Sequence, residues 1–246
     1  MTEPLGGTHP QPIVDWSPPE DDGAPRSART RSRWAVATLA VAGLLDLVAF
    51  AQDQAGLSVL NRAEAGLLTV AEGEAFDNAF ASMGAIQTVA LIATAVAYLA
   101  WLHLSIENTP GLGGGVPSVT PRWSVIWWFI PFANLVKPYQ VVADLYRRMA
   151  PRLDIGVGLV LVWWLFWVVS NLVSNLGGIT YGRAETIAAL REAFEFYSYA
   201  DLGDAVAAVL AIAVVLRIQH WADQRSTAAP TAVETAQAVP APEPAE

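Results

Sequence analysis

The stretch that decides the topology of this chain is Trp123–Val136, with the sequence WSVIWWFIPFANLV. It is apolar, but as a helix it reaches only about 21 Å, whereas the hydrocarbon core of a bilayer is about 30 Å thick. Pro131 also removes a backbone donor, and its ring interrupts an α-helix. The stretch is therefore predicted not to span a membrane, and this prediction sets the side on which every later residue lies.

Four longer apolar runs flank this stretch, two before it and two after it: residues 34–51, 84–104, 155–176 and 200–218. Each has roughly the 17–25 residues that a helix needs to cross a bilayer. Helices are expected because hydrocarbon offers no water to backbone groups. Only 15% of residues are charged, against about 25% in ordinary soluble domains. The sequence predicts an all-α polytopic membrane helical bundle with four transmembrane helices.

The positions of Lys and Arg decide between two topologies. If Trp123–Val136 does not span and the N-terminus is cytoplasmic, eleven of the 14 basic residues lie inside, and Arg62, Arg183 and Arg191 lie outside. If it spans, the division is seven to seven. The positive-inside rule favours the first topology. We therefore expect a multi-pass protein of the inner (plasma) membrane with both termini in the cytoplasm.

The two ends of the chain differ in composition from the membrane domain at 34–225. Residues 1–33 are rich in Pro, Gly and acids and end in an Arg cluster, and residues 226–246 repeat Ala, Pro, Thr and Glu. Both contain too little apolar surface to offset ordering entropy, so both are predicted to be disordered cytoplasmic tails. One alternative is a cleaved signal peptide ending near Ala51, but the long N-terminal arm and Asp46 inside the apolar run argue against it.

Residues 123–150 are predicted to form a central, non-spanning amphipathic segment, either in-plane or re-entrant. Val141, Val142, Leu145 and Met149 share one helical face, opposite Asp144 and the two arginines that follow Tyr146. Such a helix suits a membrane surface, where arginines meet anionic headgroups and tryptophans lie at the interface. The expected partner is thus the lipid bilayer with anionic headgroups at its cytoplasmic face.

The run TPRWSVIWWFIPFANLVKPYQVVADLYRRMAP, residues 120–151, resembles the signature of the actinobacterial domain of unknown function 4328 family. The residues that carry the resemblance are Trp123, Trp127, Trp128, Pro131, Asn134, Pro138, Tyr139, Gln140 and Arg147. The resemblance extends over roughly residues 34–225. It implies a multi-pass bacterial membrane protein with no assigned biochemical role.

Two hairpins flank the central segment and begin their outer loops alike, with Arg62-Ala63-Glu64 in one and Arg183-Ala184-Glu185 in the other. This similarity favours a duplicated pair of hairpins. Chance matches between Ala-rich membrane helices are the alternative.

Four polar side chains lie at similar depth in the predicted spans: Asp46, Gln87, Asn171 and Asp204. All are about 5–8 Å below the outer ends of their helices. Polar groups at that depth are costly and should face the bundle. Two interpretations remain open: a cluster that handles protons or cations, or a polar girdle that hydrogen-bonds the helices together. Asn134 is expected to cap carbonyls freed by Pro131, and the alternative is that these carbonyls line a cavity. Trp163, Trp164 and Trp167 are expected to pack against small residues, with stacking on a ligand as the alternative.

No motif for an enzyme, a cofactor, a metal or nucleic acid is expected from the sequence. The three histidines have no zinc-type spacing, and Gly111–Gly115 lacks the Lys-Ser/Thr of a phosphate loop. The run Asp201–Asp204 is distantly similar to the Gly-x-Gly-Asp of intramembrane aspartyl proteases but departs at the first Gly. The first hypothesis is a non-enzymatic membrane scaffold or accessory protein, with a homo-oligomer or a membrane protein as possible partner. The alternative is a small proton- or cation-coupled transporter or channel.

Overall fold

The computed structural model describes residues 25–151 and 156–237, and these residues form helices and connecting turns. The elements in chain order are α1 (Arg29–Glu64), α2 (Val70–Asn108), α3 (Pro121–Ile126), the 3-10 helix η1 (Ala133–Leu135), α4 (Lys137–Met149), α5 (Gly158–Gly182) and α6 (Ile187–Gln237). Of the described helices, α1, α2, α5 and α6 are long and apolar enough to cross a membrane. The predicted fold class is confirmed.

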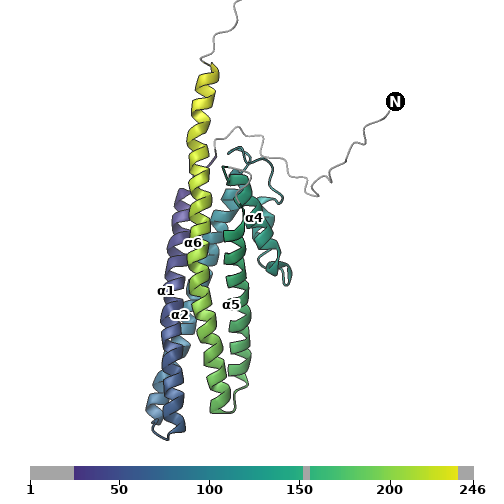
Figure 1. Ribbon diagram of the computed structural model, residues 1–246. Helices are drawn as coiled ribbons and strands as arrows, with labels where there is room; N and C mark the ends of the chain where they lie inside the picture. The colour runs from purple at the N-terminus through teal and green to yellow at the C-terminus, as the bar shows by residue number, and fades with distance from the viewer. Residues whose placement is uncertain (1–24, 152–155, 238–246) are drawn as a thin grey trace, which may run out of the picture.

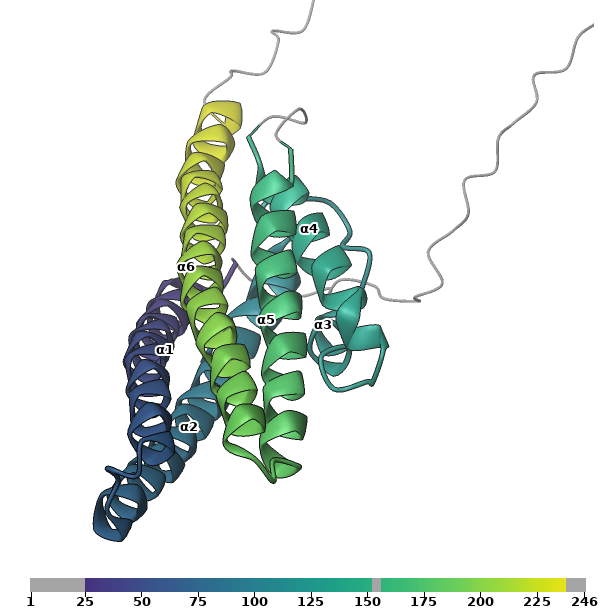
Figure 2. The same ribbon diagram turned by 60° about the horizontal axis from the view of Figure 1, so that its bottom comes forward.

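The four long helices run along one axis (Figure 1). Helix α6 packs along both α1 and α5, and α2 packs on α1. We call the end with connections 65–69 and 183–186 the hairpin end, and the opposite end, where α1 begins, the tail end. The central segment of α3, η1 and α4 does not run the length of the bundle but lies beside α5 (Figure 2). The short helices of this segment agree with the prediction that it does not span a membrane.

The helices extend well beyond the predicted spans. Helix α1 already includes residues 29–33, and α6 continues through 226–237, so both helices run into the stretches assigned to the tails. Adding a residue to an existing helix gains one hydrogen bond per residue ordered, and Ala-rich sequence favours this growth. The third span begins at Gly158 rather than at residue 155, which lies outside the described residues, as do the predicted tails at 1–24 and 238–246.

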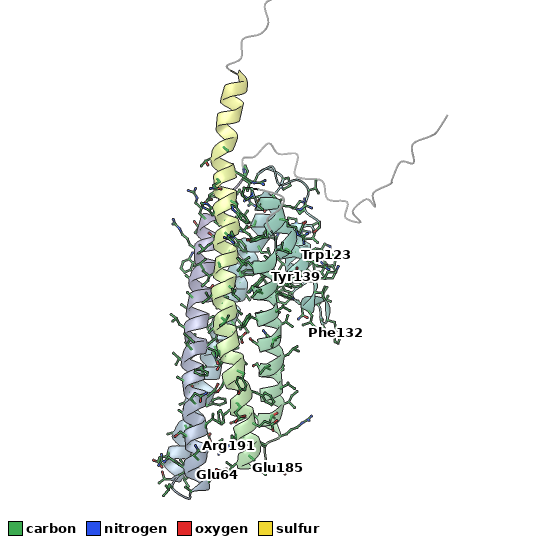
Figure 3. The ribbon with its side chains drawn as sticks, in the orientation of Figure 1. Glu64, Trp123, Phe132, Tyr139, Glu185 and Arg191 are labelled. Atoms are coloured by element: carbon green, nitrogen blue, oxygen red, sulfur yellow. The ribbon has the colours of Figure 1, made fainter. Side chains whose placement is uncertain are left out.

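Residues expected in outer loops are instead largely helical, and short turns join the helices at the hairpin end. Thr69 and Glu72 form a reciprocal capping box at the start of α2. Hydrogen bonds from the Thr69 backbone N–H and from Arg62 lower the pKa of Glu72, twelve residues before the predicted span, to about 2. An ion pair of 3.0 Å between Arg191 and Glu64 joins α6 to α1 (Figure 3). This ion pair connects the two hairpins outside the apolar region, and the contacts of Glu72 fix the turn within the first hairpin.

Small residues let the long helices approach closely. A Cβ added to Gly43 of α1 would lie 2.9 Å from the Cβ of Ala208 on α6. A Cβ added to Gly203 of α6 would overlap the hydroxyl of Ser170 on α5. Close backbone approach of this kind is the usual basis of helix association in membranes, where apolar surface alone gives no drive to pack.

The central segment is amphipathic as predicted, but its apolar face packs on the bundle. Val141, Val142 and Leu145 are at most 2% exposed. The indole N–H of Trp164 on α5 donates to the carbonyl of Leu135, 3.0 Å away, and ties the segment to the bundle. The outermost point of the segment is Phe132, which is 86% exposed and points away from the long helices (Figure 3).

Candidate functional site

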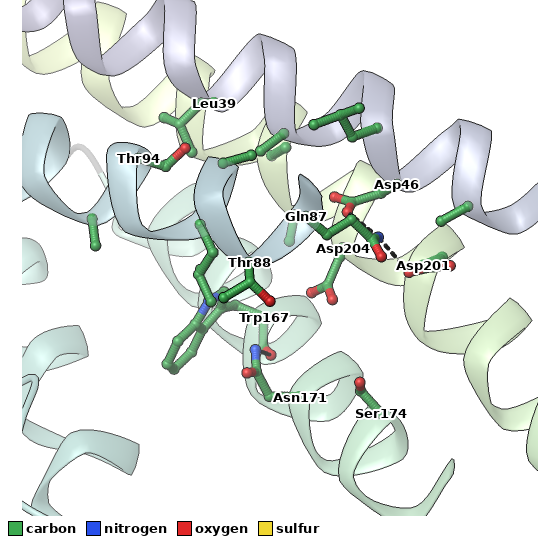
Figure 4. A pocket seen from close by; sticks show the side chains of 18 of the residues that line it. Leu39, Asp46, Gln87, Thr88, Thr94, Trp167, Asn171, Ser174, Asp201 and Asp204 are labelled. Atoms are coloured by element: carbon green, nitrogen blue, oxygen red, sulfur yellow. Dashed lines mark hydrogen bonds between the residues drawn. The ribbon is translucent and has the colours of Figure 1, made fainter. Parts of the chain in front are cut away.

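A cavity of about 720 Å³ lies between the four long helices. Its lining runs along α1 from Leu39 to Asp53, which is about 21 Å of helix at 1.5 Å per residue. Helices α2, α5 and α6 complete the wall, the loop between α3 and η1 contributes Trp128 and Phe129, and η1 contributes Asn134. Figure 4 shows the central part of the cavity with helices on all sides.

Four carboxyl groups line the cavity, and we call them the acidic layer: Asp46 and Asp53 from α1, Asp201 and Asp204 from α6. Asp46 and Asp53 are seven residues apart, two helical turns, so they share a face of α1. Asp201 and Asp204 are three apart and share a face of α6 for the same reason. Because α1 and α6 pack along each other, the two pairs come together.

Gln87 of α2 joins the two pairs of acids. Its amide nitrogen donates to Asp46 Oδ1 at 3.1 Å and to Asp201 Oδ1 at 3.2 Å (Figure 4). A carboxylate only accepts hydrogen bonds, so the Gln87 amide satisfies one oxygen of Asp46 and one oxygen of Asp201. Gln87 thus ties α2 to both α1 and α6 within the acidic layer.

The charge of the acidic layer has no counterpart in the cavity wall. None of the described lining residues is Lys, Arg or His. Asp53 is only 2% exposed, and its Oδ2 makes no hydrogen bond to the described part of the chain. Buried carboxylates normally have partners, because an unpaired charge costs several kcal/mol to desolvate. A proton, a cation or water must therefore compensate the charge of these carboxyls or bond their unpaired oxygens.

Further polar atoms without partners point to the same cavity. Besides Asp53 Oδ2, the buried Thr94 Oγ1, Tyr98 hydroxyl and Trp128 Nε1 make no hydrogen bond within the described residues, and all three side chains line the cavity. Such orphaned groups are rare in native proteins and call for bound water or a ligand. They lie toward the tail end, on the far side of Gln87 from Asp53.

That part of the cavity wall is aromatic. The ring of Trp128 lies 5.7 Å from Trp164 and 5.8 Å from Trp167, and Tyr98 lies 6.0 Å from Trp163. The α5 tryptophans therefore contact one another, Trp128 of the central segment and Tyr98 of α2. We call Tyr98, Trp128, Trp163 and Trp167, which line the cavity, the aromatic wall.

All four residues of the predicted polar layer line the cavity, but they are not equally engaged. Asp46 and Gln87 are hydrogen-bonded, and Asp204 faces them from α6 (Figure 4). Asn171 is exposed at the edge of the cavity, and its amide donates to the carbonyl of Trp167 in its own helix. Sequence reasoning missed Asp53, which lay beyond the predicted end of the span.

Asp201 was considered only as part of a protease-like motif, so its place in the acidic layer was also missed. Two signals in the sequence pointed to the complete cluster. Asp46 and Asp53 have a seven-residue spacing, and Asp201 and Asp204 have a three-residue spacing. Each spacing places both side chains of the pair on one helical face.

The residues of the central signature divide between the cavity and the surface. Trp128 and Asn134 line the cavity. Among the described hydrogen bonds the Asn134 amide caps no carbonyl, and the indole of Trp164 takes the nearby Leu135 carbonyl instead. Pro138 is buried in the first turn of α4. The remaining signature residues are exposed or half-buried: Trp123, Trp127, Pro131, Tyr139, Gln140 and Arg147.

Within residues 25–151 and 156–237, no group of three or more His, Cys, Asp or Glu side chains is arranged to hold a metal ion. The acidic layer is spread along the helices rather than gathered around one point. The arrangement therefore fits protons, water or an extended cation better than a tightly coordinated metal.

Comparison with known proteins gives a family and no close relative. No curated protein and no solved structure matches the chain. A family model described as "Domain of unknown function (DUF4328)" matches residues 65–220. The match starts just after α1, so it is narrower than the expected range of 34–225, and it includes the signature at 120–151. Since more than half of the sequence is matched, the chain belongs to the DUF4328 family.

Proposed function

We propose that the protein is a small, non-enzymatic membrane transporter that binds a cation in the acidic cavity and exchanges it for protons. The observation that carries this proposal is the acidic layer: four carboxyls line one cavity whose described wall has no positive charge. Deep in a bilayer such groups are costly, and where they occur they line ion pathways and proton relays. A cation and protons would compensate the same carboxyls in turn.

The lining of the cavity suits exchange of a cation for protons better than it suits a polar girdle, a set of hydrogen bonds that only joins the helices. A girdle would be expected to satisfy its polar groups by pairing helix to helix. Here the buried Asp53 Oδ2 makes no hydrogen bond to the described part of the chain. Four carboxyls in one cavity repel one another when they are ionised, which favours entry of a cation or of protons.

The proposal is tested in proteoliposomes with an acidic lumen that contains a pH-sensitive dye. Sodium, potassium or tetraphenylphosphonium is added outside, and lumen pH is followed. We expect at least one of these cations to make the lumen more alkaline faster than in protein-free liposomes. Asp46→Asn and Asp204→Asn should abolish the response, because an amide neither carries the charge nor exchanges the proton.

Asp77→Asn is the matched control, since Asp77 is an exposed aspartate on α2 outside the cavity. This variant should respond as the parent does. A parent protein that changes lumen pH with none of the three cations contradicts the proposal. A response that survives in both cavity variants contradicts it equally.

A membrane scaffold is the second candidate, and helix α6 favours it. The helix projects past the other helices at the tail end (Figure 1) and so offers a partner an accessible helical arm. Deleting residues 1–25 and 226–246 separates the two candidates. A scaffold should lose its partners in affinity capture, whereas a transporter should keep its flux.

We also propose that the tail end faces the cytoplasm and contacts anionic headgroups of the plasma membrane. Exposed Arg122 and Arg147 flank the central segment, and the exposed Phe129 and Phe132 extend from it. Arginine beside exposed aromatic side chains suits the interface of an anionic leaflet. Cysteine labelling from one side of intact cells tests the orientation, with single cysteines placed at Arg147 and at Glu185.

A further inference from the structure

We propose that the ligand of this cavity is an aromatic organic cation, with its charge in the acidic layer and its rings on the aromatic wall. The proposal rests on the cation-handling function above and specifies the chemical class of the cation. It follows from the size of the cavity, the polarity of its two halves and the position of its open side.

Size excludes a small ion as the sole occupant. The cavity holds about 720 Å³, whereas one water occupies about 30 Å³ in the liquid. A proton or a monovalent metal ion would leave nearly all of this space unfilled. Pockets for small organic molecules have volumes of roughly 300–1,000 Å³, so the cavity has the size of an organic ligand.

The two halves of the cavity have different chemistry. Toward the hairpin end lies the acidic layer, where Gln87 orients two of the carboxyls. Toward the tail end lies the aromatic wall, where the face of an indole favours a cation or a stacked ring. The two halves adjoin, because Trp167 lies one helical turn from Asn171, which faces the region of Asp204 (Figure 4). A single molecule that carries both a positive charge and aromatic rings contacts both halves of the cavity at once.

The orphaned polar atoms of the tail-end half give this ligand hydrogen-bonding positions. The indole N–H of Trp128 is a donor, and the hydroxyls of Thr94 and Tyr98 act as donors or acceptors. All three polar atoms are buried, and two of them belong to side chains of the aromatic wall. A purely apolar ligand would leave them unsatisfied, which costs binding energy. The site therefore favours rings that carry polar substituents, or rings that leave room for water.

The open side of the cavity lies between α2 and α5. These helices do not pack along each other in the described structure, although each packs on its neighbour in the bundle. Thr88 and Leu91 of α2, and Asn171 of α5, line the cavity and are also exposed. In a bilayer this side faces lipid, so an apolar cation that partitions into the membrane can enter from it.

The test is binding of radiolabelled tetraphenylphosphonium to the full chain in lipid nanodiscs, with empty nanodiscs subtracted. We expect saturable binding that excess unlabelled tetraphenylphosphonium removes. Triphenylphosphine oxide, which has similar rings and no net charge, should not compete. Asp204→Asn should weaken binding about tenfold or more, because it removes a desolvated charge contact. Asp204→Glu should restore part of the affinity, and Asp77→Asn should change nothing.

The aromatic half is tested separately with Trp167→Phe and Trp167→Leu. Phenylalanine keeps a ring and should lower affinity about threefold or less, whereas leucine should lower it about tenfold, as expected for loss of a cation–π contact. Circular dichroism and gel filtration of each variant show whether it is folded. The same Asp204 series decides the outcome if both Trp167 variants are misfolded.

Three results overturn the inference: no saturable binding, full competition by triphenylphosphine oxide, or unchanged affinity in Asp204→Asn. Failure of the inference is distinguishable from failure of the proposed function. If sodium or potassium changes lumen pH but tetraphenylphosphonium does not bind, only the ligand class is wrong. If tetraphenylphosphonium binds through Asp204 but no cation changes lumen pH, the site is real and the exchange is wrong.

Discussion

Trp101 and Asp53 are buried almost equally, at 0% and 2% exposed, yet they lie in regions of opposite character. Around Trp101, at the tail end, α4 adds a further helix to the bundle, and its neighbours Leu102, Tyr146 and Val214 are at most 1% exposed. Around Asp53 only the long helices are present, and they enclose a cavity instead of a packed core.

The difference shows how a membrane bundle separates stability from function. Where α4 lays its apolar face on the long helices, side chains fill the interior and dispersion contacts are maximal. Where α4 is absent, the space between α2 and α5 stays open, and the buried Asp53 Oδ2 makes no hydrogen bond to the described residues. Substitutions in the two regions should therefore have effects of different size and of opposite sign.

The largest effect is expected in the packed region. Trp101→Ala should lower the free energy of unfolding by about 3–5 kcal/mol, because a fully buried indole leaves a cavity that its neighbours fill only partly. Unfolding in mixed detergent, followed by circular dichroism, measures the loss. Trp101→Phe should cost clearly less, and an alanine variant as stable as the parent would show that this region is not the core.

The next largest loss in the free energy of unfolding is expected at the contact between α1 and α6. Gly43→Ala should cost about 1–3 kcal/mol, because its Cβ would overlap that of Ala208 in a packed interface. Ala208→Gly in the same chain removes the overlap and should recover much of the loss. Unfolding of the four members of this cycle measures the coupling, and strictly additive effects would contradict the close approach.

In the region around the cavity, a substitution should change the free energy of unfolding in the opposite direction. Asp53→Asn should raise the free energy of unfolding by about 1 kcal/mol, because it removes an unpaired buried charge while keeping the shape of the side chain. The same variant should lose the lumen pH response. A large loss of stability would instead assign Asp53 a structural role, with the acidic layer acting as a girdle between helices.

The smallest effect is expected at the hairpin end, outside both regions. Thr69→Ala removes the capping hydroxyl of α2 and should cost about 0.5–1 kcal/mol. Thr69→Ser keeps the hydroxyl and serves as the control. Both should leave cation exchange unchanged, and loss of exchange in the alanine variant would mean that the turn at 65–69 takes part in function.

Much of the fold was predictable because the relevant signals are local. Apolar runs of sufficient length mark the long helices, and Pro131 with a short run marks the segment that does not span. The helix ends were not predictable in this way. Asp53 lies past the apolar run, and only the packing of helical extensions at the hairpin end keeps it buried and ordered.

The candidate site was predictable in part. Asp46, Gln87 and Asp204 were identified by depth alone, because a polar residue in an apolar run stands out. Depth does not define rotation about the helix axis, and Asn171 accordingly has the right depth but lies at the exposed edge. Asp201 is the second residue of the predicted span 200–218 and was recognisable only through the side of α6 that faces α1.

By itself the sequence determined the number of long helices and the non-spanning segment, because hydrophobic length is a property read along one dimension. Only the tertiary structure decided which polar groups meet, that α4 packs on the bundle, and that a cavity remains between α2 and α5. These depend on helix rotation and on close contacts such as that of Gly43 with Ala208. In a chain whose lipid-facing and buried surfaces are equally apolar, hydrophobicity does not distinguish the two, and packing alone does.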